Sequence, residues 1–119
     1  MNNNRSKVNI ISFVNQLVNK TREGKCEWEE TSDNNYRLLL KNGSVIFSYI
    51  KEKSFTDNYC YSLKLFDEVD CFASYQSSTY DDAIGIYMYL EDLRKAIDNN
   101  KDAIIENKIF NLSQNLENL

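Results

Sequence analysis

The chain has 119 residues, a length that predicts one domain whose core can fold without disulfide bonds. It contains no histidine, the usual general base near neutral pH and the commonest metal ligand, so most hydrolase triads and transition-metal sites are excluded. Its formal net charge is −4, and this acidic balance disfavours direct nucleic-acid binding, which needs clustered lysine and arginine.

An amphipathic helix is predicted over residues 7–23, with Ser6 as its N-cap. Gly24 is expected to end it, because glycine readily adopts the left-handed conformation that follows a helix. The helical spacing of apolar residues gives a stripe of Ile10, Val14, Leu17 and Val18. Residues 1–5, which include three consecutive asparagines, are expected to form a disordered tail.

From Cys26 to Tyr75 the apolar period changes to two, which indicates β-strands. Asn42-Gly43 lies between two apolar runs and predicts a hairpin with a type I′ turn. In the resulting register Leu38 is opposite Phe47, Leu40 is opposite Val45 and Tyr36 is opposite Tyr49, all on one core-facing side. Five strands are expected in all, as an antiparallel meander over residues 25–31, 36–41, 44–49, 59–66 and 69–75.

Two helices are predicted after the strands. The first covers residues 80–98, with Ser78 or Thr79 as its cap, and Asn99-Asn100 is expected to break it. Its apolar stripe comprises Ala83, Ile86, Tyr87, Leu90, Leu93 and Ile97. The second covers residues 101–115 and carries Ile105, Ile109, Leu112 and Leu116 on one face. The order of elements predicts a single α+β domain over residues 1–119, with the helices packed on one face of the sheet.

Residues with catalytic chemistry do not form a recognisable constellation in the sequence. Glu27 and Glu29 alternate along an expected solvated strand, where carboxylates are ordinary surface groups. The three cysteines, Cys26, Cys60 and Cys71, lack a basic activator and metal-ligand spacing, so they are interpreted as small buried hydrophobic residues. Gly85 is placed inside the long helix, where close approach of another backbone is one explanation. We therefore expect no enzyme activity, no catalytic or metal-binding residue and no cofactor.

Binding residues are expected among the eight tyrosines and the apolar residues off the main helical stripes. Tyrosine offers a wide, stiff contact surface and is enriched at protein interfaces. Lone Trp28 is assigned to the core beneath the first helix, where its indole N–H needs a partner. Intramolecular packing of the last helix is the alternative explanation for part of this set. The candidate interaction residues are Tyr59, Tyr61, Tyr89, Ile84, Met88 and Phe110.

A second hypothesis is that a tyrosine-lined sheet face holds a small ligand, such as a nucleotide signal, by stacking. A basic residue beside the tyrosines would favour it. Arg37 and Arg94 are the arginines placed to serve, together with Tyr75.

Three segments of the chain resemble a group of known proteins: Thr21 to Trp28, Thr31 to Tyr36 and Tyr87 to Arg94. On these residues the chain resembles a loose group of small bacterial and phage-borne proteins. They share a helix, a Gly-Lys-x-x-Trp strand, a meander and C-terminal helices. The resemblance covers most of the chain and implies an α+β fold, but it implies no activity for any residue.

The leading prediction is a non-enzymatic, acidic protein-binding module. It suits a stoichiometric inhibitor, or an immunity-type or anti-defence factor of a mobile element, whose partner has a basic surface. Association of two copies of the chain as a homodimer is an alternative that the sequence also allows. The sequence shows neither a signal peptide nor an apolar run long enough to span a membrane, so a cytoplasmic location and no membrane partner are expected.

Overall fold

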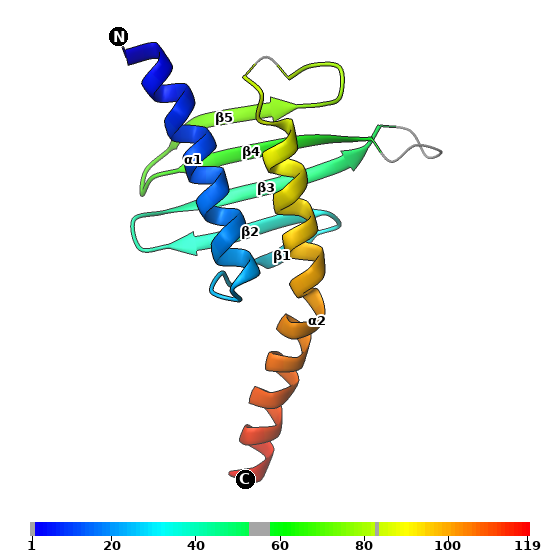
Figure 1. Ribbon diagram of the computed structural model, residues 1–119. Coiled ribbons are helices and arrows are strands. Elements are labelled where there is room, and N and C mark those ends of the chain that lie inside the picture. The colour runs from blue at the N-terminus through cyan, green and yellow to red at the C-terminus, as the bar shows by residue number, and fades with distance from the viewer. Residues whose placement is uncertain (1, 53–57, 83) are drawn as a thin grey trace.

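The computed structural model describes residues 2–52, 58–82 and 84–119, with side chains described from residue 9 onward. These residues form two helices and a five-stranded sheet. In chain order the elements are α1 (Asn2–Arg22), β1 (Glu29–Ser32), β2 (Asn35–Leu40), β3 (Gly43–Lys51), β4 (Tyr59–Phe66), β5 (Cys71–Ser77) and α2 (Tyr87–Glu117). The strands lie side by side in the order β1-β2-β3-β4-β5, and every neighbouring pair is antiparallel. The predicted α+β class and the antiparallel meander are confirmed (Figure 1).

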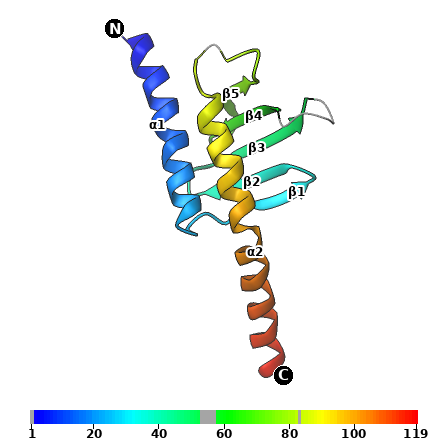
Figure 2. The ribbon, with the colours of Figure 1, turned by 45° about the vertical axis from the view of Figure 1, so that its right-hand side comes forward.

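The core lies between one face of the sheet and the two helices, which run side by side across it (Figures 1 and 2). Alternation along each strand decides which side chains enter it: Val45, Phe47 and Tyr49 are buried, whereas Ile50 is exposed on the opposite face. The helices contribute the predicted residues Ile10, Val14, Leu17 and Val18 from α1 and Leu90, Leu93 and Ile97 from α2, and Ala96 of α2 is buried with them although it was not predicted. No described element covers the second face of the sheet.

Thr21 joins the helices and the strand region at one point of the core. It is buried, and its Oγ1 accepts a hydrogen bond of 3.0 Å from Nε1 of Trp28. The amide of Asn100 in α2 donates to the Thr21 carbonyl. The predicted burial of Trp28 beneath the first helix is therefore confirmed, and Thr21 supplies the indole partner that the prediction required.

The β2–β3 hairpin differs from the predicted one by two residues of register. Leu38 is opposite Val45 and Tyr36 is opposite Phe47, and the turn residues are Lys41 and Asn42. A shift of two keeps every side chain on its predicted face, so the predicted core face is correct although the pairing was wrong.

Gly43 explains the shift. It belongs to β3, opposite Leu40, and neither it nor Asn42 has a positive φ, so the predicted type I′ turn is wrong. A Cβ at Gly43 would fall far inside van der Waals contact with the backbone carbonyl of Phe66. Glycine is needed here for the close approach of β3 and β4 and not for a left-handed turn.

Helix α2 begins later than predicted, at Tyr87, and its N-cap residue is Ile86, so neither Ser78 nor Thr79 is the cap. The Asp82 carboxylate accepts hydrogen bonds from the backbone N–H groups of Ile86 and Tyr87, at 2.9 and 3.0 Å, and from the Ser77 hydroxyl at 2.8 Å. Gly85 lies before the helix with a φ of +71°, so its predicted place inside the helix was wrong, and its role is a left-handed loop conformation. Ala83, predicted in the stripe, lies outside the described residues.

One continuous helix replaces the two that were predicted at the C-terminus. Asn99 and Asn100 do not interrupt α2, because asparagine costs only about 0.7 kcal/mol or less in a helix interior and no proline or glycine follows it. The segment 101–117, here called the α2 tail, extends beyond the β1 edge of the sheet in both views (Figures 1 and 2). At 1.5 Å per residue the tail is about 25 Å long.

Candidate protein-interaction site

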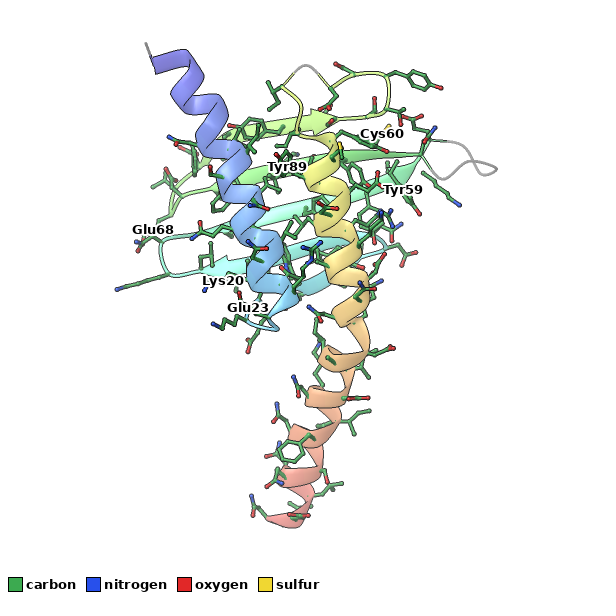
Figure 3. All side chains as sticks on the ribbon, in the orientation of Figure 1. Lys20, Glu23, Tyr59, Cys60, Glu68 and Tyr89 are labelled. Atoms are coloured by element: carbon green, nitrogen blue, oxygen red, sulfur yellow. The ribbon has the colours of Figure 1, made fainter. Side chains whose placement is uncertain are left out.

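The α2 tail carries an exposed apolar stripe. Its four residues are between 54% and 68% exposed although all are large and aliphatic: Ile105, Ile109, Leu112 and Leu116. Intervals of four, three and four residues place them on one side of the helix. Beyond Lys101, whose amine lies 4.0 Å from the Glu30 carboxylate of β1, the tail projects clear of the sheet (Figure 3). A contiguous apolar stripe of this kind is typical of an interaction site.

This stripe is not a continuation of the buried face of α2. At 3.6 residues per turn, the stripe is rotated by about 100° around the axis relative to Leu90, Leu93 and Ile97. A straight helix therefore directs its two apolar faces to different sides. The first faces the chain's own sheet, and the second points sideways, roughly at a right angle to the buried face.

The tail is a weak helix without a partner. Helices shorter than about 12–15 residues are marginal in water even for favourable sequences, and packing of an apolar face supplies most helix stability in proteins. The tail is somewhat longer than this but contains Asn107, Asn111 and Asn115, which are poor helix formers. Covering its apolar stripe would add the missing stabilisation.

A cluster of aromatic rings fastens the first half of α2 to the sheet. The Tyr61 ring is buried and lies 5.9 Å from Phe47, 6.0 Å from Tyr59 and 5.3 Å from Tyr87, centroid to centroid. Arg94 of α2 donates from Nε to the Tyr61 hydroxyl at 2.9 Å, and its guanidinium lies 4.2 Å from the Tyr59 ring centroid. These contacts place the cation–π pair at the edge of the core.

Asp98, one turn after Arg94, continues the cluster toward the tail. Its carboxylate lies 3.6 Å from a terminal nitrogen of Arg94 and accepts a hydrogen bond of 3.2 Å from the Tyr49 hydroxyl. Lys101 follows, with its amine 3.8 Å from Asp98 and 5.4 Å from the Tyr36 ring centroid. Glu91 and Lys95, one turn apart on α2, form a separate ion pair of 3.3 Å. The cluster thus ends where the tail begins and fastens α2 to the sheet only as far as Lys101.

Three tyrosines of the cluster, Tyr36, Tyr49 and Tyr61, have a pKa above the usual value for a phenol. Burial raises the pKa of Tyr61 to about 12, although its hydrogen bond from Arg94 acts in the opposite direction. Burial also raises the pKa of Tyr49 and, less strongly, of Tyr36. A phenol that ionises only at high pH does not serve as a base near neutrality, so the cluster is structural.

Stability is expected to decrease between about pH 10 and pH 12. In this window an unfolded chain has lost the Tyr61 proton, which the folded chain retains, so rising pH favours unfolding. Denaturant unfolding at several pH values measures the slope. The decrease should be shallower for Tyr61→Phe, which has no phenol at this position, and equal slopes for the two proteins would contradict this assignment.

The six predicted interaction residues do not share one surface. Tyr61 is buried, and Tyr59 is half-buried beside it. Tyr89 is half-buried on the side of α2 that faces α1, opposite to Tyr59 (Figure 3). Ile84 lies in the loop before α2 and is half-buried, whereas Met88 is exposed at the start of that helix. Phe110 is exposed on the tail, on a different side from the stripe.

The residues proposed for a small ligand are also dispersed. Arg94 does lie beside Tyr59 and Tyr61, but its donors are already directed to Tyr61 and Asp98. Arg37 lies on the uncovered face of the sheet and pairs with Glu29. Tyr75, half-buried on the helix-bearing face, borders a separate groove.

This groove lies beside α1 and has a volume of about 790 Å³. Its floor contains the buried side chains of Val45 and Leu65, and Phe13 of α1 forms one wall. Leu40 is on the helix-bearing face but remains 50% exposed, because neither helix covers this end of the sheet. The full lining is Asn9, Ile10, Phe13, Leu40, Lys41, Asn42, Gly43, Ser44, Val45, Leu65, Phe66, Asp67, Phe72, Ala73 and Tyr75.

The cysteines are less buried than predicted. Cys60 and Cys71 are exposed and Cys26 is only half-buried, so the interpretation as buried hydrophobic residues was wrong for the first two. Partial burial of its sulfur and the neighbouring Glu52 carboxylate raise the pKa of Cys60, which weakens it as a nucleophile. Within the described ranges, no three side chains of histidine, cysteine, aspartate or glutamate are grouped so as to hold a metal ion.

Comparison with known proteins gives no relative. No protein-family model matches the chain, and no curated protein or solved structure matches it. Neither helix, over its described residues, is both long and apolar enough to cross a membrane.

Proposed function

We propose that the chain is a non-enzymatic protein-binding module that engages its partner through the apolar stripe of the α2 tail. The observation that carries this proposal is the exposure of Ile105, Ile109, Leu112 and Leu116 on a helix that projects from the fold. Recognition of an amphipathic helix by a hydrophobic groove uses apolar anchors at these intervals. The aromatic cluster fastens the first half of α2 to the sheet, and the stripe follows on the same continuous helix.

Charges on the tail fit a partner with a mildly basic surface. Asp102, Glu106 and Glu117 outnumber Lys101 and Lys108, and the whole chain has a net charge of −4. Opposite charges around an apolar contact accelerate association and select the partner. We propose stoichiometric inhibition as the form of binding, as in an immunity-type or anti-defence factor of a mobile element, because the chain is small and acidic and offers one projecting anchor.

Ligand binding is the second candidate, and the groove beside α1 favours it. A volume of about 790 Å³ lies within the range of about 300–1,000 Å³ typical of ligand sites. The aliphatic and aromatic lining suits an apolar molecule better than a nucleotide. Arg94, the residue that would contact a phosphate, already binds Tyr61 and Asp98.

A matched pair of variants tests the proposed function. Tagged wild-type chain, Leu112→Asp and Leu39→Asp are used to capture partners from the native cells, followed by native mass spectrometry. Leu112 and Leu39 are 65% and 67% exposed, but Leu39 lies on the uncovered sheet face. We expect Leu112→Asp to lose at least about tenfold of the bound protein, as removal of one central anchor typically costs 2 kcal/mol or more, and Leu39→Asp to retain it.

Two results would contradict the proposal. The first is equal capture of the same protein by wild type and Leu112→Asp, since the stripe would then be irrelevant to binding. The second is a co-purifying small molecule in place of a protein, which would favour the ligand-binding alternative.

A further inference from the structure

We propose that the partner of the α2 tail is a second copy of this chain, and that the tail of each copy fills the groove beside α1 of the other. The inference rests on the proposed use of the apolar stripe in protein binding, but its partner is an acidic chain of net charge −4 in place of one with a basic surface. Two exposed apolar surfaces support the inference. One is the stripe of the α2 tail, and the other is the groove on the helix-bearing face of the sheet.

The groove has the form of a vacant helix position. Val45, Leu65 and Ala73 are cross-strand partners in adjacent strands and form a row that runs across the sheet. Leu38, the partner of Val45, continues this row on β2. Phe13 of α1 and Leu40, which lies one residue pair beyond Leu38 and is opposite Gly43, line the groove on either side of it. A helix placed on the row would pack beside α1 as α2 does on its other side.

The lengths of the two surfaces agree. The row from β2 to β5 crosses three gaps of about 4.8 Å each, which makes about 14 Å. The stripe from Ile105 to Leu116 covers eleven residue steps of 1.5 Å, which makes about 16 Å. The four aliphatic side chains of the stripe can therefore extend over all four strands of the groove.

The tail of a copy does not reach its own groove. Helix α2 is continuous, and its tail leaves the fold past β1 (Figures 1 and 2). The groove contains no α2 residue, and the β2–β3 and β4–β5 turns that border it lie beyond α1 as seen from α2 (Figure 1). A second copy resolves this geometry. Reciprocal docking of the two tails gives a closed two-fold dimer in which each contact occurs twice, so both stripes are buried.

Charges at the two surfaces are compatible. The rim of the groove presents Lys41 and Asp67, and the tail flanks its stripe with Glu106 and Lys108. Each surface therefore offers the other one charge of each sign. Direct pairing of two tails as a coiled coil is the competing arrangement. It has only about two heptads from Ile105 to Leu119, whereas a coiled coil is indicated by about three to four.

Light scattering of the purified full chain after size-exclusion chromatography tests the inference. The expected mass of wild type is twice the 14.0 kDa of one chain. Leu112→Asp removes the tail anchor and Leu40→Asp places a charge in the groove, and both should be monomeric. Leu39→Asp is the control: it is the adjacent residue with the same substitution on the opposite sheet face, and it should remain dimeric. Thermal unfolding verifies that each variant is folded.

Mixing the two monomeric variants distinguishes docking of each tail in the other chain's groove from direct pairing of the two tails. Leu112→Asp retains an intact groove, and Leu40→Asp retains an intact tail. Together they should form a complex that contains one chain of each variant. Its affinity should be weaker than that of the wild-type dimer, because only one of the two tail–groove contacts remains. Ala73→Arg is a second groove variant with the same expected result. If Leu40→Asp and Ala73→Arg stay dimeric while Leu112→Asp is monomeric, the tails pair directly and the groove proposal is overturned.

A wild-type monomer at every concentration also overturns the inference. The proposed function is judged separately, because loss of a captured host protein by Leu112→Asp would then still show that the stripe binds another protein. Failure of both experiments would remove the stripe as a binding site altogether.

Discussion

Replacement of Tyr61 with alanine should lower the free energy of unfolding by about 3–5 kcal/mol, the range for large aromatic-to-alanine changes in a core. Tyr61 is 1% exposed and contacts rings from β3, β4 and the first turn of α2. Its loss would leave a cavity at the junction of sheet and helix, and Nε of Arg94 would lose its acceptor. Urea unfolding followed by circular dichroism measures the change.

Tyr61→Phe is the matched control, because it keeps the ring and removes only the hydroxyl. Its expected cost is about 1–2 kcal/mol, the cost of a hydrogen bond to a charged group that water can partly replace. If the phenylalanine variant is as unstable as the alanine variant, the hydrogen bond to Arg94 and not ring packing dominates at this position.

Replacement of Gly43 with alanine is expected to cost about 3 kcal/mol, the upper end of the usual overpacking range. The added Cβ would meet the carbonyl of Phe66, and a backbone atom cannot rotate away as a side chain can. The β3 and β4 strands would have to separate where they approach most closely. Thermal and urea unfolding measure the loss.

Asn42→Ala tests whether this effect is specific to Gly43. Asn42 is exposed in the adjoining turn, so its replacement should change stability by about 0.5 kcal/mol or less. A neutral Gly43→Ala variant would contradict the proposed close approach. Equal losses for both variants would instead indicate that the turn itself is the sensitive feature.

Local patterns in the sequence predict most of the fold. Alternation in β3 placed Val45, Phe47 and Tyr49 in the core, and helical spacing did the same for Leu90, Leu93 and Ile97; both are confirmed. Each of these patterns arises within a single strand or helix that buries one face, so it can be recognised in the sequence without knowledge of the tertiary structure.

The errors concern residues whose roles depend on distant parts of the chain. Gly43 resembles a turn glycine, but Phe66 requires it, 23 positions later in the numbering. Asn100 resembles a helix break, yet its side chain binds the Thr21 carbonyl and α2 continues. The Asp82 carboxylate binds backbone N–H groups at the start of α2 from four and five residues away, which a search for a cap beside the apolar stripe does not find.

The candidate site was only partly predictable for the same reason. The apolar pattern of Ile105, Ile109, Leu112 and Leu116 is visible in the sequence, but its exposure follows from the continuity of α2. Tyr61 was predicted as an interaction residue because nothing local shows that Arg94, 33 residues later, covers it. The residue types predict protein binding, whereas the position of the candidate surface on the α2 tail follows only from the three-dimensional arrangement.

Amide hydrogen exchange of residues 101–117 tests most directly whether the α2 tail is a binding surface. The exchange of this segment is followed by mass spectrometry at low and high chain concentration, with residues 87–98 as the internal reference. We predict rapid exchange in the dilute chain and strong protection on association, while the reference segment stays unchanged. Equal and strong protection of the tail at both concentrations, in a chain that is monomeric throughout, would show that the tail needs no partner and would contradict the account.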